Sequence, residues 1–146
     1  MEHAAVVIEA LFNVAERKVS ILTGNLNPRV YSGYEIMSQA IGFLSRNSRN
    51  ELQILKEDDN LEIFEFNAFI QVMKKFPTVS VRSAPSDLRS RYRFHFVVAD
   101  CNSYRFEQDR DSPSAIASFG DNKGGSNLCS VFDTLWKMST PVALSS

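Results

Sequence analysis

The sequence has few of the residues that would mark a metal centre, a disulfide scaffold or a membrane span. Its 146 residues include two histidines and two cysteines, Cys101 and Cys129. Two cysteines are too few for a disulfide scaffold and lack a metal-ligand spacing, so we expect no metal and no cofactor. No apolar run reaches the roughly 18 residues of a membrane span. The formal net charge of −1 gives no global electrostatic reason to bind nucleic acid or a membrane surface.

The apolar N-terminal stretch does not have the pattern of a signal peptide. Glu9 interrupts it, and no basic region precedes it. We therefore expect a cytoplasmic location by default.

The composition is that of one globular domain over residues 1–146, because 44% of the residues are apolar and 23% are charged. Hydrophobic periodicity predicts helices over 10–18, 34–47, 61–76 and 126–139. It predicts strands over 18–24, 51–58, 78–85, 91–100, 103–108 and 114–121, with a loop over 25–33. Alternating strands and helices predict parallel strands, and the late hairpin adds antiparallel ones. The sequence therefore predicts an α/β fold: a mixed β-sheet with helices on both faces.

The same periodicity predicts which side chains of each helix face the core. They are Val7, Leu11 and Val14; Ile36, Ala40, Phe43 and Leu44; Phe66, Phe69, Ile70 and Met73; and Leu128, Val131, Phe132 and Leu135.

This order of elements resembles one half-domain of the phospholipase D superfamily, and the local text agrees over nearly the whole chain. "ALFNVAERKVSILTGNL" resembles the opening helix and first strand of that superfamily, and "AIGFLSRNSRNELQIL" resembles its second helix and the next strand. "HFVVAD" and the later "AIASFGD" resemble its catalytic strand and the small-residue turn that follows. The resemblance implies a single phospholipase D-like half-domain.

The catalytic signature of active members, His-x-Lys-x4-Asp followed by Gly-Ser-x-Asn, is degenerate here. Aligning "VVAD" places Asp100 at the signature Asp, His95 at the Lys and Arg93 at the nucleophilic His. In the downstream turn, Ala117, Ser118 and Gly120 stand at the Gly, Ser and Asn positions.

A second alignment, with His95 at the nucleophile, puts Val97 at the Lys and Asn102 at the Asp, so neither alignment restores the signature. Active members attack a phosphodiester with one histidine, and a histidine from a second copy of the motif protonates the leaving group. Arginine cannot be the nucleophile because it stays protonated. The resemblance thus implies a non-catalytic member, with no catalytic residue unless His95 serves as one.

Alternation along the strand 91–100 places Arg91, Arg93 and His95 on one face, with the aromatic residues between them on the other. With Ser118 and Arg105 nearby, these residues would form a cationic ligand pocket inherited from a phosphate site. The alternative is that these side chains are solvated or are paired with Asp100, Glu107 or Asp109.

Three other stretches have both a functional and a structural interpretation. In "SAPSDLRSRYR" and just before it, Arg82, Arg89, Arg91 and Arg93 form a basic stretch that would suit nucleic acid or would be an ordinary solvated loop. In "KEDDN", Glu57, Asp58 and Asp59 would hold a divalent ion or would cap the next helix. In the loop 25–33, Asn25 and Arg29 would line a pocket at a strand end, or Asn25 and Asn27 would cap the loop.

The glycine-rich "FGDNKGGSN" lacks the lysine pattern of a phosphate loop. We interpret it as a turn with Ser126 as N-cap.

These features lead to three functional hypotheses. The first is a non-catalytic homodimeric module, an accessory or regulatory subunit of a bacterial system, that binds a protein partner or an anionic, phosphate-containing ligand. The homodimer follows from the resemblance, because active members need two half-domains. The second is a divergent phosphodiesterase or nuclease using His95 from each protomer, and the third is a nucleic-acid binder without hydrolysis.

Overall fold

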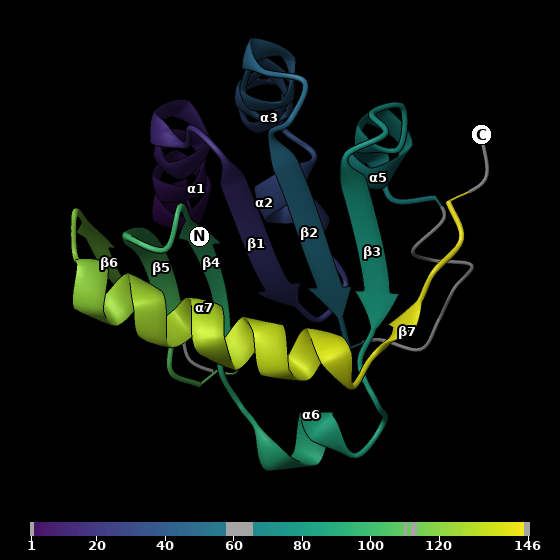
Figure 1. The fold of residues 1–146 in the computed structure, drawn as a ribbon, viewed down its shortest axis with the longest axis vertical. Helices are drawn as coiled ribbons and strands as arrows, with labels where there is room; N and C mark the ends of the chain where they lie inside the picture. The colour runs from purple at the N-terminus through teal and green to yellow at the C-terminus, as the bar shows by residue number, and fades with distance from the viewer. Residues whose placement is uncertain (1, 58–65, 110, 112–113, 145–146) are drawn as a thin grey trace.

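The protein is built around a seven-stranded mixed sheet, described by a computed structural model that covers residues 2–57, 66–109, 111 and 114–144 (Figure 1). The strand order is β6-β5-β4-β1-β2-β3-β7. β1, β2 and β3 are parallel, β4 lies antiparallel to β1, and hairpins continue through β5 and β6. The predicted mixed sheet is confirmed. The strands are β1 (Lys18–Thr23), β2 (Glu51–Lys56), β3 (Val79–Ser83), β4 (His95–Ala99), β5 (Ser103–Glu107), β6 (Ile116–Phe119) and β7 (Thr140–Pro141).

Helices cover both faces of this sheet, as predicted (Figure 1). One face carries α1 (Glu2–Val14), α2 (Pro28–Tyr31), α3 (Tyr34–Arg46) and α5 (Ala68–Met73). The other carries α7 (Asn122–Lys137), which crosses the strands, and the short α6 (Leu88–Arg91). No helix among the described residues combines the length and apolar character needed to cross a membrane.

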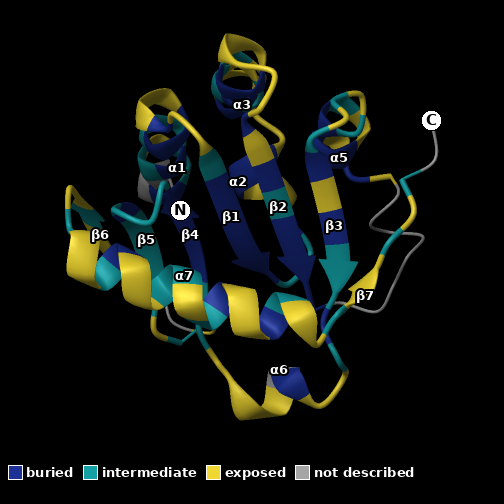
Figure 2. Cartoon of the chain, in the orientation of Figure 1, coloured by how far each residue is buried: buried dark blue, intermediate teal, exposed yellow. Residues whose placement is uncertain are grey.

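The alternation of side chains along the strands divides the core into two layers. Val19 and Ile21 of β1 pack beneath α1 and α3, whereas Leu22 faces α7. Because both faces are covered, β1 is buried over nearly its whole length. Figure 2 shows the buried central strands inside helices whose outer sides are exposed.

The predicted inner face of α3 is confirmed, but that of α1 is wrong at one of its three residues. Leu11 is buried as predicted and Val7 is half-buried, but Val14 is 47% exposed, and Ile8 and Phe12 are buried in its place. The segment is apolar almost all round, so its period does not determine which side meets the sheet. α1 also begins earlier than predicted, at Glu2.

Two other helices begin at residues different from those predicted. Residues 61–65 of the predicted third helix lie outside the described residues; α5 starts at Ala68, and Phe66 is 76% exposed. The Asn67 side chain caps α5 by accepting bonds from two backbone N–H groups. α7 starts at Asn122 with Asp121 as its N-cap, so the prediction of Ser126 was wrong.

The two cysteines form a disulfide that joins the β4–β5 turn to α7. Cys101 and Cys129 have Cα atoms 5.7 Å apart. α7 approaches this turn closely at Gly125, where a Cβ atom would collide with the backbone of Cys101. One cross-link is not a disulfide scaffold, but the pairing itself was not predicted from the sequence.

Candidate functional site

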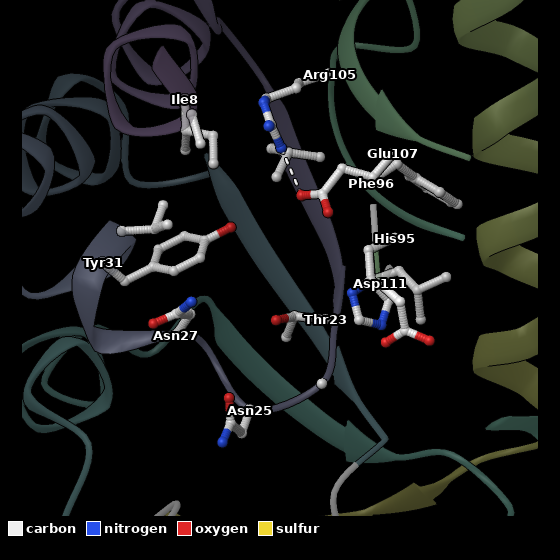
Figure 3. Close-up of a pocket in the computed structure, with 15 residues that line it drawn as sticks. Ile8, Thr23, Asn25, Asn27, Tyr31, His95, Phe96, Arg105, Glu107 and Asp111 are labelled. Atoms are coloured by element: carbon white, nitrogen blue, oxygen red, sulfur yellow. Dashed lines mark hydrogen bonds and ion pairs between the residues drawn. The ribbon is translucent and has the colours of Figure 1, made fainter. Parts of the chain in front are cut away.

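A cavity of about 430 Å³ lies where β1 ends, between the sheet and helices α1 and α2 (Figure 3). One side of the cavity floor is formed by β1 and the loop after it, and the other side is formed by β4 and β5. α1 and α2 form the roof. The lining residues are Ala4, Ile8, Leu22, Thr23, Gly24, Asn25, Asn27, Val30, Tyr31, His95, Phe96, Val97, Arg105, Glu107 and Asp111.

The loop after β1 turns sharply and thereby brings polar side chains to the cavity. The backbone N–H of Leu26 donates to the Thr23 hydroxyl at 3.1 Å, and Leu26 has a φ of 60°. Asn27 then caps α2 by accepting from the N–H of Arg29. Asn25 lines the cavity, as one interpretation predicted, whereas Arg29 is not among the lining residues. The predicted loop therefore includes a short helix that closes the site.

His95 stands at the start of β4 and is held by a buried carboxylate from the end of β2. Its Nε2 lies 2.5 Å from Oε1 of Glu57, whose side chain is 1% exposed. The other carboxylate oxygen, Oε2, is buried and has no hydrogen-bond partner among the residues that the structure describes. A histidine held in this way has a defined orientation, and Nδ1 is the ring nitrogen that Glu57 does not engage.

Arg105 and Glu107 alternate along β5 and form an ion pair inside the cavity, with Nη1 and Oε1 2.5 Å apart (Figure 3). The strand register places Glu107 opposite His95. Tyr31 lies across from this pair. Burial is the main cause that raises the pKa of Tyr31, and the charge of Glu107 adds to it while Arg105 opposes it. The Tyr31 phenol therefore stays neutral and can donate a hydrogen bond.

The prediction that Arg91, Arg93 and His95 share one strand face was wrong. β4 begins only at His95, and Arg91 belongs to α6, which forms because Leu88 is buried against the α7 layer. Arg91 is exposed and lies 4.0 Å from Asp87.

Arg93 points to solvent, where it pairs with Asp109 at 3.1 Å and also with Asp111. Hydrogen bonding to Asp109 is the main cause that raises the pKa of Arg93. Arg93 and Arg105 are therefore both paired with carboxylates, Arg93 with Asp109 and Arg105 with Glu107. This pairing was the structural alternative to a cationic ligand pocket. Of the aromatic residues in this stretch, Phe94 and Phe96 do pack on the α7 face, where Phe94 stacks on Phe96 and Phe96 meets Phe132, whereas Tyr92 is exposed.

Ser118 is on β6 opposite Tyr104, on the face of the sheet turned toward α7. Arg105 faces the other side, so Ser118 and Arg105 do not meet. Of the five predicted ligand residues, the structure brings only His95 and Arg105 into the cavity. Ligand binding by any of the five stays a prediction.

Asp100, at the signature Asp position, has a structural task. Its carboxylate accepts hydrogen bonds of 2.8 to 3.0 Å from the backbone N–H groups of Glu16, Arg17 and Lys18. It thereby holds the α1–β1 connection against the β4–β5 turn. Asp100 and Cys101 both have positive φ, so the turn between β4 and β5 is centred on them.

The predicted basic stretch is dispersed in the structure. Arg82 donates to the carbonyl of Trp136 and lies 4.9 Å from the centroid of its ring. Arg91 and Arg93 have the acidic neighbours described above, and the side chain of Arg89 lies outside the described part of the chain. Among the described side chains of this stretch, Arg82, Arg91 and Arg93 each have a partner of their own.

Of the acidic "KEDDN" segment, Glu57 forms the pair with His95, and Asp58 and Asp59 lie outside the described residues. Within the described ranges no group of three or more His, Cys, Asp or Glu side chains is arranged to hold a metal ion.

Tyr31 as a lining residue and Glu57 as the partner of His95 were not predicted from the sequence. Glu107 was predicted as one possible partner of the cationic side chains. Its place opposite His95 follows from the hairpin register, because the pairing of Ala99 with Ser103 next to the turn also pairs His95 with Glu107. Glu57 was considered only as a metal ligand or cap. No local signal in the sequence links it to His95.

Comparisons with known proteins place this geometry in context. A family model described as "Domain of unknown function (DUF7931)" matches residues 1–144. No curated protein matches the sequence significantly.

Three solved structures share the fold. NucT from Helicobacter pylori aligns with a TM-score of 0.67 and 12% identity, over 97% of this chain and 92% of NucT. Nuc, a phospholipase D family member from Salmonella typhimurium, aligns with a TM-score of 0.63 and 9% identity, over 94% of this chain and 89% of Nuc. TrmBL2, an archaeal chromatin protein with a novel mode of DNA binding, aligns with a TM-score of 0.67 and 11% identity, over 96% of this chain. This chain spans about half of TrmBL2, at 51%. The fold is therefore that of the phospholipase D family.

Proposed function

The chain belongs to the DUF7931 family, and we propose that it is a non-catalytic phospholipase D-like module that acts by binding. The fold is retained, while the residues that would carry phosphodiester hydrolysis are replaced. This corresponds to the first of the three hypotheses drawn from the sequence.

The observation that carries the proposal is the pairing of Arg93 and Arg105 with carboxylates, at the strands that correspond to the catalytic region of active members. Hydrolysis needs a nucleophile and free positive charge to hold the phosphate oxygens. Arg93, at the nucleophile position, is a permanent cation that does not line the cavity and is bound to Asp109 and Asp111. Arg105 is bound to Glu107. A phosphodiester in this cavity would meet carboxylates where active members present lysines.

We further propose a homodimeric accessory or regulatory subunit in a bacterial system. The alignments cover 92% of NucT and 89% of Nuc, both from bacteria. By the resemblance, a second copy would supply the facing half. Light scattering coupled to gel filtration tests this point: a mass of twice 16.5 kDa supports it, and a monomer at all concentrations contradicts it.

The cytoplasmic location remains a prediction. The disulfide is the observation that weighs against it, because structural disulfides are rare in the cytosol of most organisms.

The experiment for the main proposal is a phosphodiesterase assay on a chromogenic diester and on single- and double-stranded DNA. Wild type and His95→Ala are compared with an active phospholipase D-family enzyme as positive control. We expect neither wild type nor His95→Ala to hydrolyse any of these substrates. Turnover by wild type that disappears in His95→Ala would contradict the proposal. Binding of the DNA substrates across a salt series tests the nucleic-acid hypothesis in the same samples.

One observation favours the second candidate, a divergent phosphodiesterase. His95 lines the cavity and is oriented by buried Glu57, as a catalytic histidine would be. In that case a ring nitrogen of His95 would attack phosphorus, forming a P–N bond as the alkoxide leaves. A covalent phosphohistidine trapped by rapid quenching, and absent in His95→Ala, would identify this mechanism.

A further inference from the structure

The arginine and carboxylate side chains that line the cavity already have partners of opposite charge. Among the described lining residues, Arg105 and Glu107 are paired with each other, with Nη1 and Oε1 2.5 Å apart. Asp111, which is exposed, is paired with Arg93. An entering ligand therefore meets no unpaired arginine, lysine or carboxylate among these side chains.

The lining also has hydroxyl, amide and imidazole groups with unused hydrogen-bonding capacity. The Tyr31 hydroxyl and the Asn25 side-chain amide form no hydrogen bond with another described residue. The Thr23 hydroxyl accepts from one backbone N–H and can still donate its own proton. The His95 ring is held through Nε2, which leaves Nδ1 to a ligand. Together these groups can both donate to a ligand and accept from it.

These groups adjoin a space with an apolar wall. Figure 3 shows the Tyr31 hydroxyl directed from α2 into the cavity, toward the Arg105–Glu107 pair. Tyr31 is 5% exposed, and its phenol stays neutral because burial raises its pKa. Ala4 and Ile8 of α1, each at most 5% exposed, line the same cavity. Its volume of about 430 Å³ is within the range of small-molecule sites.

A charged ligand would gain little in this site. Its transfer out of water costs the free energy of hydration, and an unpaired opposite charge would be needed to offset that cost. Arg105 and Glu107 instead satisfy each other. A neutral polar ligand loses less hydration, and the open hydroxyl and amide groups replace the hydrogen bonds that it made with water.

From this arrangement we propose that the cavity binds an uncharged small organic molecule whose polar group both donates and accepts hydrogen bonds, as a carboxamide or a hydroxyl does. The Tyr31 hydroxyl donates to the oxygen of that group. The Asn25 amide and Nδ1 of His95 meet its remaining donor and acceptor sites. The apolar part of the ligand rests against Ala4 and Ile8.

This ligand class rests on the proposed function, since it concerns the same site, but the two fail separately. Diester turnover by the wild-type protein would contradict the proposed function whatever the cavity binds. Preference for a charged probe in a protein without turnover would contradict only the ligand class.

The test uses five probes: benzamide, benzoate, benzamidine, benzyl alcohol and inorganic phosphate. At pH 7 the first three have nearly the same shape and are neutral, negative and positive, and benzyl alcohol distinguishes a hydroxyl from a carboxamide. Each is titrated into the 15N-labelled protein, and the amide shifts of Gly24, Tyr31 and Glu107 report on the cavity. We expect at least one neutral probe to bind at least about tenfold more tightly than benzoate, benzamidine and phosphate, because only the charged probes lose strong hydration without a counter-charge.

Tyr31→Phe tests the proposed donor, because it removes one hydroxyl and keeps the ring. Binding of the neutral probe is expected to weaken by about threefold to tenfold, as the loss of one neutral hydrogen bond provides. The control is Tyr34→Phe, the same chemical change at a tyrosine that is 81% exposed and does not line the cavity. It should leave binding unchanged.

Two further variants test whether the ion pair excludes charged ligands. Glu107→Gln releases Arg105 and is expected to strengthen benzoate binding by at least about tenfold, whereas Arg105→Gln releases Glu107 and should do the same for benzamidine. The control is Asp133→Asn, a charge change at an exposed site on α7, across the sheet. If either cavity variant does not fold, the other and Tyr31→Phe still test the proposal.

Equal or tighter binding of benzoate, benzamidine or phosphate to wild type would overturn the proposal. So would neutral-probe binding that Tyr31→Phe leaves unchanged, shifts confined to residues outside the cavity, or no shift with any probe.

Discussion

Removing the disulfide between Cys101 and Cys129 is expected to destabilise the protein through its unfolded state. The bond joins residues separated by 28 positions. In the chain-entropy description, a cross-link of this span restricts the unfolded chain by about 3.6 kcal/mol at 25 °C. For a chain of this length, that loss corresponds to a fall in melting temperature of about 12 °C.

Other contacts hold the same junction in the folded state. The backbone N–H of Asp121 donates to the carbonyl of Asn102 at 2.7 Å, and the Tyr104 hydroxyl donates to the Asp121 carboxylate at 2.6 Å. The native fold is therefore expected to persist without the bond. Because the uncross-linked unfolded chain exposes more surface, the slope of stability against denaturant is expected to rise.

The assay is urea unfolding followed by the fluorescence of Trp136, the single tryptophan, which stacks on Phe132 with ring centroids 5.5 Å apart. Oxidised wild type, wild type in reductant and the double variant Cys101→Ser/Cys129→Ser are compared. The last two should coincide and should unfold at lower urea than the first. Equal midpoints for all three would refute the entropic reasoning, and two titratable thiols in unreduced, unfolded wild type would refute the pairing.

Three further predictions concern the same end of the sheet. Gly125→Ala is expected to cost about 1–3 kcal/mol in urea unfolding, because its new Cβ collides with the backbone of the β4–β5 turn; Gly42→Ala, whose Cβ would meet nothing nearer than 3.8 Å, should be neutral or stabilising. Asp100→Ala is expected to cost about 1–3 kcal/mol by leaving three backbone donors without their acceptor, and Asp100→Asn should cost less because asparagine keeps one acceptor and tolerates positive φ; equal costs would contradict this explanation. The hydrogen bond from Tyr104 is the main cause that lowers the pKa of Asp121. This pair therefore contributes stability above the unfolded-state pKa of an aspartate, and the contribution is lost as pH falls through the lower folded-state pKa. Tyr104→Phe should lose less stability than wild type between pH 7 and pH 3, and parallel pH profiles of stability for the two proteins would argue against the linkage.

Much of the fold was predictable because its elements have strong local patterns. β1, β2 and β3 are short β-branched or alternating runs between loops, and the inward residues of α3 recur at clear helical spacing. α1 was predicted less well because apolar residues occur on most of its sides. The disulfide could not be predicted, since pairing depends on how α7 crosses the β4–β5 turn.

The candidate site was predictable only where its residues share one local element. His95 and Arg105 lie on adjacent strands of one hairpin, and both were expected in a pocket. The residue that orients His95 is Glu57, which lies 38 positions away in the sequence. Tyr31 belongs to a segment that was expected to be a loop. Contacts of this kind depend on the packing of β2, α2 and β4, which no local periodicity specifies.

The antiparallel pairing of β1 with β4 also has a consequence for folding kinetics. β1, β2 and β3 form one group of neighbours in sequence, and β4, β5 and β6 form another; the two groups meet along β1 and β4. The bond from the Lys18 amide to Asp100 at this junction spans 82 positions, so joining the groups carries a large loop-closure cost. Thr23 and His95 contribute to the cavity from opposite sides of the junction. The cavity should therefore form only when the two groups dock, and stopped-flow ligand binding would time that step of folding.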